Sequence, residues 1–189
     1  MRAFLALDLP EDVTDGLERI QAHLRTGRHV LPEDMHLTLA FMGDVTLAQL
    51  DELHLSLEMA APPLLHLHLS ALDTFGTDPP RSLHVLAHGD GLPDYQRKIT
   101  TMVRNAGIAL PARRFIPHVT LARFPNRIAP DDLARIGRFL SAHGDFKWPA
   151  FVPPAVALYQ STLTDDGPRY DLLERYPLYP TQLPSAVHR

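Results

Sequence analysis

The chain has no cysteine among its 189 residues and no apolar run of the length that spans a bilayer. The first absence excludes disulfides, thiolate zinc ligands and cysteine nucleophiles, and the second excludes a transmembrane helix of about 20 residues. An excess of positive charge is also lacking, because 18 basic residues stand against 22 acidic ones. Recognition of nucleic acid would therefore depend on a local site. No signal-peptide cleavage site follows the short apolar segment 4–9, and we expect a cytoplasmic protein that does not bind membranes.

Short patterned segments follow one another along the chain and predict a mixed α+β fold. Hydrophobic residues make up 45% of the sequence, which is enough to bury a sizeable core. Alternation of apolar with polar or small residues predicts strands at 4–9, 35–41, 65–72, 82–88, 115–123 and 155–163. Apolar spacings of three and four residues predict helices at 11–26, 47–57, 93–106 and 130–140.

The pattern His-x-Thr-Leu-Ala occurs twice, beginning at His36 and at His118. In a chain with 11 histidines, the bare His-x-Thr pattern is expected about once, but composition does not explain two copies of the longer pattern. Each half of the chain also contains a strand followed by a helix. We therefore predict an internal duplication. The chain would be a single bilobal domain, 1–189, with two interleaved lobes that carry one motif each, at 36–38 and 118–120, and face a shared cleft.

The two motifs bring together residue types that suit phosphodiester cleavage. Residues i and i+2 of a strand point to the same side, so His36 shares a face with Thr38, and His118 shares one with Thr120. If the strands meet across a cleft, one imidazole can take a proton from a nucleophile while the other gives one to the leaving oxygen. The hydroxyls can hold the non-bridging oxygens, and no metal is required. The alternative is that both pairs are half-exposed polar faces of strands.

The strings at 36–41 and 118–123 resemble the paired signatures of the 2H phosphoesterase superfamily, specifically its RNA 2',3'-cyclic phosphodiesterase (2'-5' RNA ligase-like) branch. Residues 4–8, 32–33, 80–81, 158–161 and 167–170 are also similar to that branch, so the resemblance covers nearly the whole chain. It implies an α+β, bilobal fold with pseudo-twofold symmetry, in which two antiparallel sheets line a central cleft and the helices lie outside.

The resemblance further implies hydrolysis of RNA 2',3'-cyclic phosphate ends to 2'-phosphomonoesters without metal or cofactor, and reversible 2'-5' RNA ligation as a side activity. Its two catalytic histidines and two phosphate-binding threonines correspond to His36, His118, Thr38 and Thr120. We favour His118 as the base and His36 as the acid. Arg123 would also hold the phosphate, but strict alternation puts it on the core face, so this role needs a bend or bulge. Phe41, at the same offset in the first motif, is a candidate for stacking on a base or ribose, with a place in the core as the alternative.

Some positions depart from the branch and put its substrate contacts in doubt. His84 stands where the branch often has tryptophan, His29 where an aromatic residue is common, and Gln160 where arginine is frequent. Four histidines on neighbouring strands offer a zinc or nickel site, but without a carboxylate at ligand spacing the alternative is a solvent-facing strand surface: His66, His68, His84 and His88. A group of arginines is either a guide for an RNA end or solvated surface: Arg104, Arg113, Arg114, Arg123 and Arg127.

Two other functions fit the same four motif residues. One is a phosphodiesterase for 2'-5' oligonucleotides or small cyclic nucleotides, and the other is a non-catalytic module that binds RNA ends. The expected partner is an RNA with a 2',3'-cyclic phosphate terminus or a small cyclic nucleotide, bound by a monomer. The sequence does not decide the length or base preference of the RNA.

Overall fold

A computed structural model describes residues 1–76, 78–112, 114–164 and 167–179 of the protein. The strands are β1 (Arg2–Asp8), β2 (Arg28–His29), β3 (His36–Asp44), β4 (Leu67–Phe75), β5 (Ser82–His88), β6 (His118–Arg123), β7 (Lys147–Phe151), β8 (Ala155–Thr164) and β9 (Gly167–Pro177). The helices are α1 (Glu11–Gln21), α2 (Leu47–Glu58), α3 (Leu92–Asn105) and α4 (Pro130–His143), with a short 3₁₀ helix, η1 (Pro32–Asp34). None of the helices in these ranges is long and apolar enough to cross a membrane.

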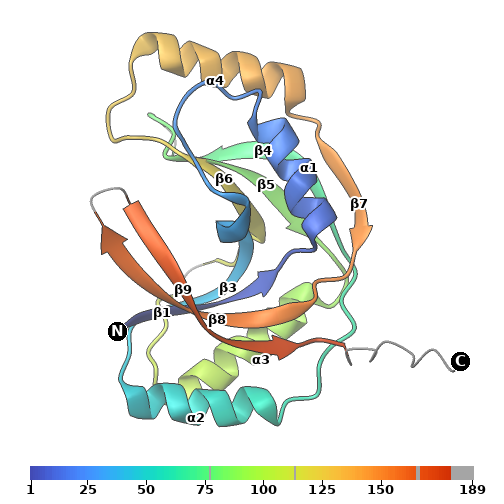
Figure 1. Ribbon diagram of the computed structural model, residues 1–189, viewed down its shortest axis with the longest axis vertical. Coiled ribbons are helices and arrows are strands. Elements are labelled where there is room, and N and C mark those ends of the chain that lie inside the picture. The colour runs from blue at the N-terminus through green and yellow to red at the C-terminus, as the bar shows by residue number, and fades with distance from the viewer. Residues whose placement is uncertain (77, 113, 165–166, 180–189) are drawn as a thin grey trace, which may run out of the picture.

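All strands belong to one curved antiparallel sheet with the order β7-β4-β5-β6-β3-β1-β8-β9, and β2 pairs with β6 beside this path (Figure 1). The two expected sheets are thus the two halves of a continuous one, and the α+β fold class is confirmed. The two halves of the sheet contain the same number of strands along this path. Counted outward from the centre, β3 has the same position in its half as β6 in the other, as do β1 and β5, β8 and β4, and β9 and β7. The halves meet where β3 pairs with β6, at Leu37 and Val119. These are the middle residues of the two His-x-Thr motifs.

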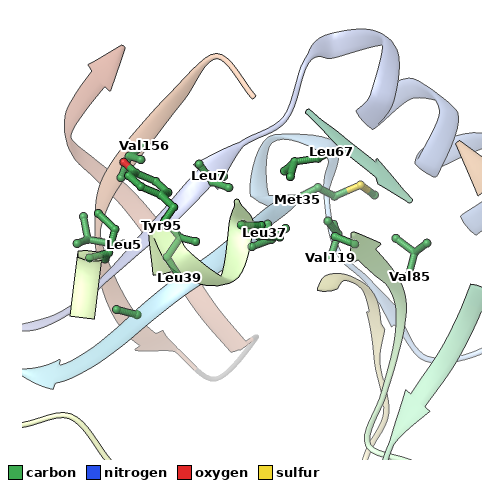
Figure 2. Packing of buried hydrophobic residues seen from close by; sticks show 14 of the residues in the cluster. Leu5, Leu7, Met35, Leu37, Leu39, Leu67, Val85, Tyr95, Val119 and Val156 are labelled. Atoms are coloured by element: carbon green, nitrogen blue, oxygen red, sulfur yellow. The ribbon is translucent and has the colours of Figure 1, made fainter. Parts of the chain in front are cut away.

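One apolar core runs beneath the junction of the two halves. Leu37 and Val119 are fully buried in it and lie close together in Figure 2. Buried residues from all four helices belong to the same cluster, so the helices cover the face of the sheet on which these two side chains lie. Because neighbouring strand residues point to opposite faces, the histidines and threonines beside them lie on the other face.

Both central strands contain a bulge at the same place in the motif. In the pairing of β1 with β3, the register skips Leu39, and in the pairing of β5 with β6 it skips Leu121. Each bulge puts two consecutive buried residues into the strand, which are Leu39 with Ala40 and Leu121 with Ala122. An extra residue on one strand reverses the alternation of faces beyond it. The residues that follow the bulges therefore return to the face that carries the motifs.

The structure differs from the sequence prediction at several elements. The first helix ends at Gln21 rather than near residue 26, because the Gln21 amide donates to the carbonyls of Val30 (2.8 Å) and Leu121 (2.7 Å) and so ties the chain to β6. The strand of the second motif begins at residue 118 rather than 115. The strands β7 and β9 were not predicted. They are the two edges of the sheet, and their residues are mostly exposed and show no apolar alternation.

Candidate active site

The side chains that the sequence singles out line one cavity of about 870 Å³: His36, Thr38, Phe41, His118, Thr120 and Arg123. The two histidines open their strands, and the pairing of Leu37 with Val119 sets the two motifs side by side. Both imidazoles and both hydroxyls are half-buried at the cavity wall. Two proton-transfer groups and two hydrogen-bond donors for an anion are thereby brought to one site.

Arg123 and Phe41 reach this cavity because of the bulges. Each follows the two consecutive buried residues of its strand, so its side chain lies on the face of the motif rather than in the core. The bulge that the role of Arg123 requires is therefore present. Phe41 is 42% exposed, which excludes the alternative of a place in the core. The Arg123 guanidinium donates to the hydroxyl of Tyr170 on β9 (3.2 Å).

His118 has a defined orientation and tautomer. Its Nδ1 donates to the backbone carbonyl of Ile116 at 2.7 Å, because a carbonyl oxygen can only accept. Nε2 then carries the lone pair that can take up a proton. Burial lowers the pKa of the imidazole, the hydrogen bond to Ile116 partly offsets this, and the charge of Arg123 lowers it further. His118 is therefore neutral near pH 7.

The imidazole of His36 packs against aromatic rings from the strands β1, β8 and β9. The ring centroid of Phe4 is 4.8 Å from that of His36, and the rings of Tyr170 and Tyr159 are at 5.3 Å and 5.8 Å. Burial lowers the pKa of His36 to about 4. A hydrogen bond to the backbone of Asp34 opposes this decrease, the charge of Arg123 adds to it, and the carboxylate of Asp8 opposes it.

A buried carboxylate network lies beside His36. Asp8, which is 8% exposed and pairs with His36 across β1 and β3, accepts hydrogen bonds from the Tyr159 hydroxyl (2.8 Å) and from Nε of Arg175 (2.6 Å). Burial, followed by the neighbouring Asp8 carboxylate, raises the pKa of Tyr159 to about 12. Hydrogen bonds of this kind hold the carboxyl group in place.

Several residues of the site were not identified as functional from the sequence. Phe4 and Tyr170 line the cavity wall, and Asp8 is buried beneath it. Tyr170 could not be placed because β9 has no strand pattern in the sequence. Asp8, in contrast, is a charged residue within the otherwise apolar segment 4–9, and this is a signal that could have identified it.

His84 is packed against the face of the sheet that carries the two motifs, although it does not line the cavity. Its ring is 3.9 Å from that of Phe75 and 5.2 Å from that of His118, centroid to centroid. It is 1% exposed, and its Nδ1 has no hydrogen-bond partner among the described residues. Burial, and then the neighbouring His118, lower its pKa to about 4. The neutral imidazole thus packs as an aromatic ring against Phe75 and His118. Burial of its Nδ1 without a hydrogen-bond partner destabilises the folded protein.

We expect His84→Phe to stabilise the protein by ~1 kcal/mol near neutral pH, because it removes a buried polar atom without a partner. The variant should also lose less stability in acid. Below pH 6.5 the unfolded chain protonates this histidine before the folded one does, so wild-type stability falls from pH 6.5 toward pH 4. Urea unfolding at two pH values measures both effects. His88→Phe, at an exposed position of the same strand, is the control, and a less stable H84F variant would contradict this account.

The four strand histidines do not converge. His68 and His88 face each other across β4 and β5 on an exposed surface, with ring centroids 5.3 Å apart, whereas His84 is buried beside His118. His66 precedes β4. Within the ranges that the structure describes, no three histidine, aspartate or glutamate side chains are grouped so as to hold a metal ion.

The predicted group of arginines is divided between two cavities. Arg123 lines the first cavity, Arg104 and Arg114 line a neighbouring one, and Arg127 lines neither. Arg113 lies outside the described residues. Of the positions that depart from the family pattern, His29 lines the first cavity, whereas Gln160 on β8 lines neither.

Comparison with known proteins shows similarity along most of the chain. A model of the family described as LigT-like phosphoesterase matches residues 7–84, which include the first motif. The RNA 2',3'-cyclic phosphodiesterase of Methanocaldococcus jannaschii is 26% identical over 179 residues, covering 93% of this chain and 100% of the relative. That of Methanothermobacter thermautotrophicus is 30% identical over 188 residues, covering 94% and 99%. The crystal structure of TT0787 from Thermus thermophilus matches with a TM-score of 0.75 at 26% identity, covering 94% of this chain and 98% of that one.

Proposed function

Since this chain belongs to the LigT-like family of 2H phosphoesterases, we propose that it hydrolyses the 2',3'-cyclic phosphate at the end of an RNA to a 2'-phosphomonoester. The observation that carries the proposal is the convergence of two imidazoles and two threonine hydroxyls in one cavity, through the pairing of Leu37 with Val119. Relatives of nearly the same length that are named RNA 2',3'-cyclic phosphodiesterase support the choice of substrate.

In the proposed reaction, Nε2 of His118 takes a proton from water as the water oxygen attacks phosphorus. The bond between phosphorus and O3' breaks, and His36 gives its proton to O3'. The products are a 2'-phosphomonoester and a free 3'-hydroxyl. Thr38, Thr120 and Arg123 hold the non-bridging oxygens, on which negative charge increases in the transition state. The mechanism needs no metal ion, because the two histidines supply both proton transfers.

The surroundings of the two histidines support this division of roles. The anionic phosphate would pair with Arg123 and so remove a charge that lowers the pKa of both imidazoles. Asp8 would then still favour the protonated form of His36, whereas the hydrogen bond to Ile116 keeps Nε2 of His118 as the proton acceptor. His36 thus becomes the acid when substrate is bound.

We expect kcat/KM to follow a bell-shaped pH profile with its maximum below pH 6.5. Both imidazoles have a pKa below the ordinary 6.5 in the free site, and one must be protonated and the other neutral. The protonated fraction of the acid falls as the pH rises, and the neutral fraction of the base falls as the pH drops further below 6.5. The profile of kcat should lie at higher pH, because the bound anion raises both pKa values. Initial rates across pH 4–9 measure both profiles, and a kcat/KM that still increases above pH 8 would contradict the assignment.

The direct test incubates the purified protein, in excess EDTA, with 2',3'-cyclic AMP and with a short RNA that ends in a 2',3'-cyclic phosphate. Release of a 2'-phosphate is expected on both substrates. Release of a 3'-phosphate would mean that the other phosphodiester bond breaks, and dependence on added metal would rule out the two-histidine mechanism. We propose 2'-5' ligation as a minor side reaction, in which an RNA hydroxyl replaces water as the nucleophile, the bond between phosphorus and O3' breaks and O3' takes the proton from His36. It should appear only with a high concentration of an acceptor RNA.

A further inference from the structure

A second cavity, of about 1050 Å³, adjoins the active site. Residues of β3, of the segment 114–116 that precedes β6 and of α3 line it. Five residues line both cavities, so that the two are continuous: Arg2, Thr38, Phe41, Phe75 and His118. The space exists because β3 and β6 pair only at Leu37 and Val119 among the described residues and diverge beyond that point.

The charge of this second cavity is positive. Four arginines line it, Arg2, Arg97, Arg104 and Arg114, whereas none of the described residues that line it is acidic. Arg97 pairs with Asp94 on its own helix, but neither Arg104 nor Arg114 forms an ion pair within the described part of the chain. In a protein with a net charge of −4, such an imbalance creates a local attraction for anions.

The sequence of α3 explains how these groups are presented. Arg97, Thr100 and Arg104 follow one another at spacings of three and four and form one stripe along the helix. The buried stripe of the helix is a different one: Leu92, Tyr95, Ile99 and Val103. The Gln96 amide donates to the carbonyl of Leu39, the bulge residue of β3, at 3.2 Å. This bond fixes the polar stripe beside the first motif.

Phe41 lies where the two cavities join. It is 42% exposed, and the guanidinium of Arg2 is 5.3 Å from its ring centroid. Phe115, which lies in the segment that precedes β6, also lines the second cavity. Arginines that meet phosphates, with exposed aromatic rings that stack on bases, are the combination with which proteins bind single-stranded nucleic acid.

We propose that the second cavity binds the RNA strand on the 5' side of the cyclic phosphate, with its backbone phosphates on Arg104, Arg114 and Arg97. This rests on the proposed function, because an RNA whose end occupies the active site must leave it through a continuous opening. The cavity that shares His118 and Thr38 with the active site is such an opening. The arginines would also attract a free acidic peptide, but such a peptide has no end group that must reach the active site. The connection between the two cavities therefore favours RNA as the ligand.

The test compares kcat/KM for 2',3'-cyclic AMP with that for a short RNA ending in a cyclic phosphate. Arg104→Ala combined with Arg114→Ala should lower kcat/KM about 10-fold for the RNA and leave the mononucleotide unchanged. For the wild type, kcat/KM on the RNA should decrease as the salt concentration rises. In a plot of log kcat/KM against the logarithm of the salt concentration, the slope should be smaller for the double variant by about 0.7 per lost phosphate contact. Arg138→Ala, an exposed arginine of α4 that lines neither cavity, is the control and should match the wild type.

Binding of a fluorescent RNA ending in a 2'-phosphate, followed by anisotropy, examines the cavity independently of turnover. The double variant should bind about 10-fold more weakly than the wild type. Equal effects of the variants on both substrates, or unchanged RNA binding, would overturn the inference while leaving the proposed function intact. Absence of hydrolysis together with arginine-dependent RNA binding would overturn the proposed function instead. Displacement by an acidic peptide, but not by unlabelled RNA, would identify a different ligand and reject the proposal.

Discussion

Alanine in place of His118 is expected to lower kcat by about 10²- to 10⁴-fold, because a positioned general base contributes an acceleration of that size. His36→Ala should produce a similar loss through removal of the general acid. Both side chains are half-buried at a cavity wall rather than in the core, so the variants should fold. His88→Ala, at an exposed histidine outside both cavities, is the control and should retain the wild-type rate.

The rates are measured with saturating 2',3'-cyclic AMP, and circular dichroism with thermal unfolding establishes that each variant is folded. Because the histidines act in proton transfer, the loss should be in kcat far more than in KM. A folded H118A or H36A variant that turns over at the wild-type rate would show that the two-histidine mechanism is wrong.

Arg123→Ala is expected to lower kcat/KM by about 10²- to 10³-fold, the usual cost of removing one group that stabilises an oxyanion. Arg123→Lys should recover only part of this loss, since lysine keeps the charge but not the planar pair of donors. Arg127→Ala removes an equal charge four positions away, at an exposed residue outside the cavity, and should have little effect. If R127A and R123A lost the same activity, the effect would be one of overall charge, and the phosphate-binding role of Arg123 would be wrong.

Tyr170 provides a graded version of this test. Its hydroxyl accepts a hydrogen bond from Arg123, so Tyr170→Phe should loosen the guanidinium without removing it. We expect a decrease in kcat/KM of about 5-fold, corresponding to one hydrogen bond of ~1 kcal/mol. In the R123A background the same substitution should have almost no further effect, because its partner is already absent.

The sequence predicted the faces of the two motifs because alternation is a local property. Residues 37, 39, 119 and 121 flank the threonines of the motifs and are apolar, and the structure buries all four. The position of Arg123 could not be obtained in this way. A bulge depends on pairing with a neighbouring strand, and the sequence around Leu121 contains no signal that specifies it. Here the resemblance to a family indicated that a bulge was needed.

The parts of the site that sequence reasoning missed depend on distant contacts. Tyr170 belongs to β9, whose strand is held by long pairing with β8 rather than by its own pattern, so nothing local placed it beside Arg123. The burial of His84 likewise follows from packing against Phe75 of β4, whereas its alternating sequence neighbours were also consistent with a solvent-facing histidine. The matching bulges in β3 and β6 add to the case for an internal duplication, which remains a prediction.

The joint action of the two motifs in one site is tested most directly by combining His36→Ala with His118→Ala and comparing kcat of the double variant with those of the single variants. Residues that act as a unit are strongly non-additive, because loss of either one already disables their shared mechanism. The double variant should therefore be no more than about threefold slower than the slower single variant. If the two losses instead multiplied, the histidines would act independently, and a single acid–base pair shared between the two motifs would be contradicted.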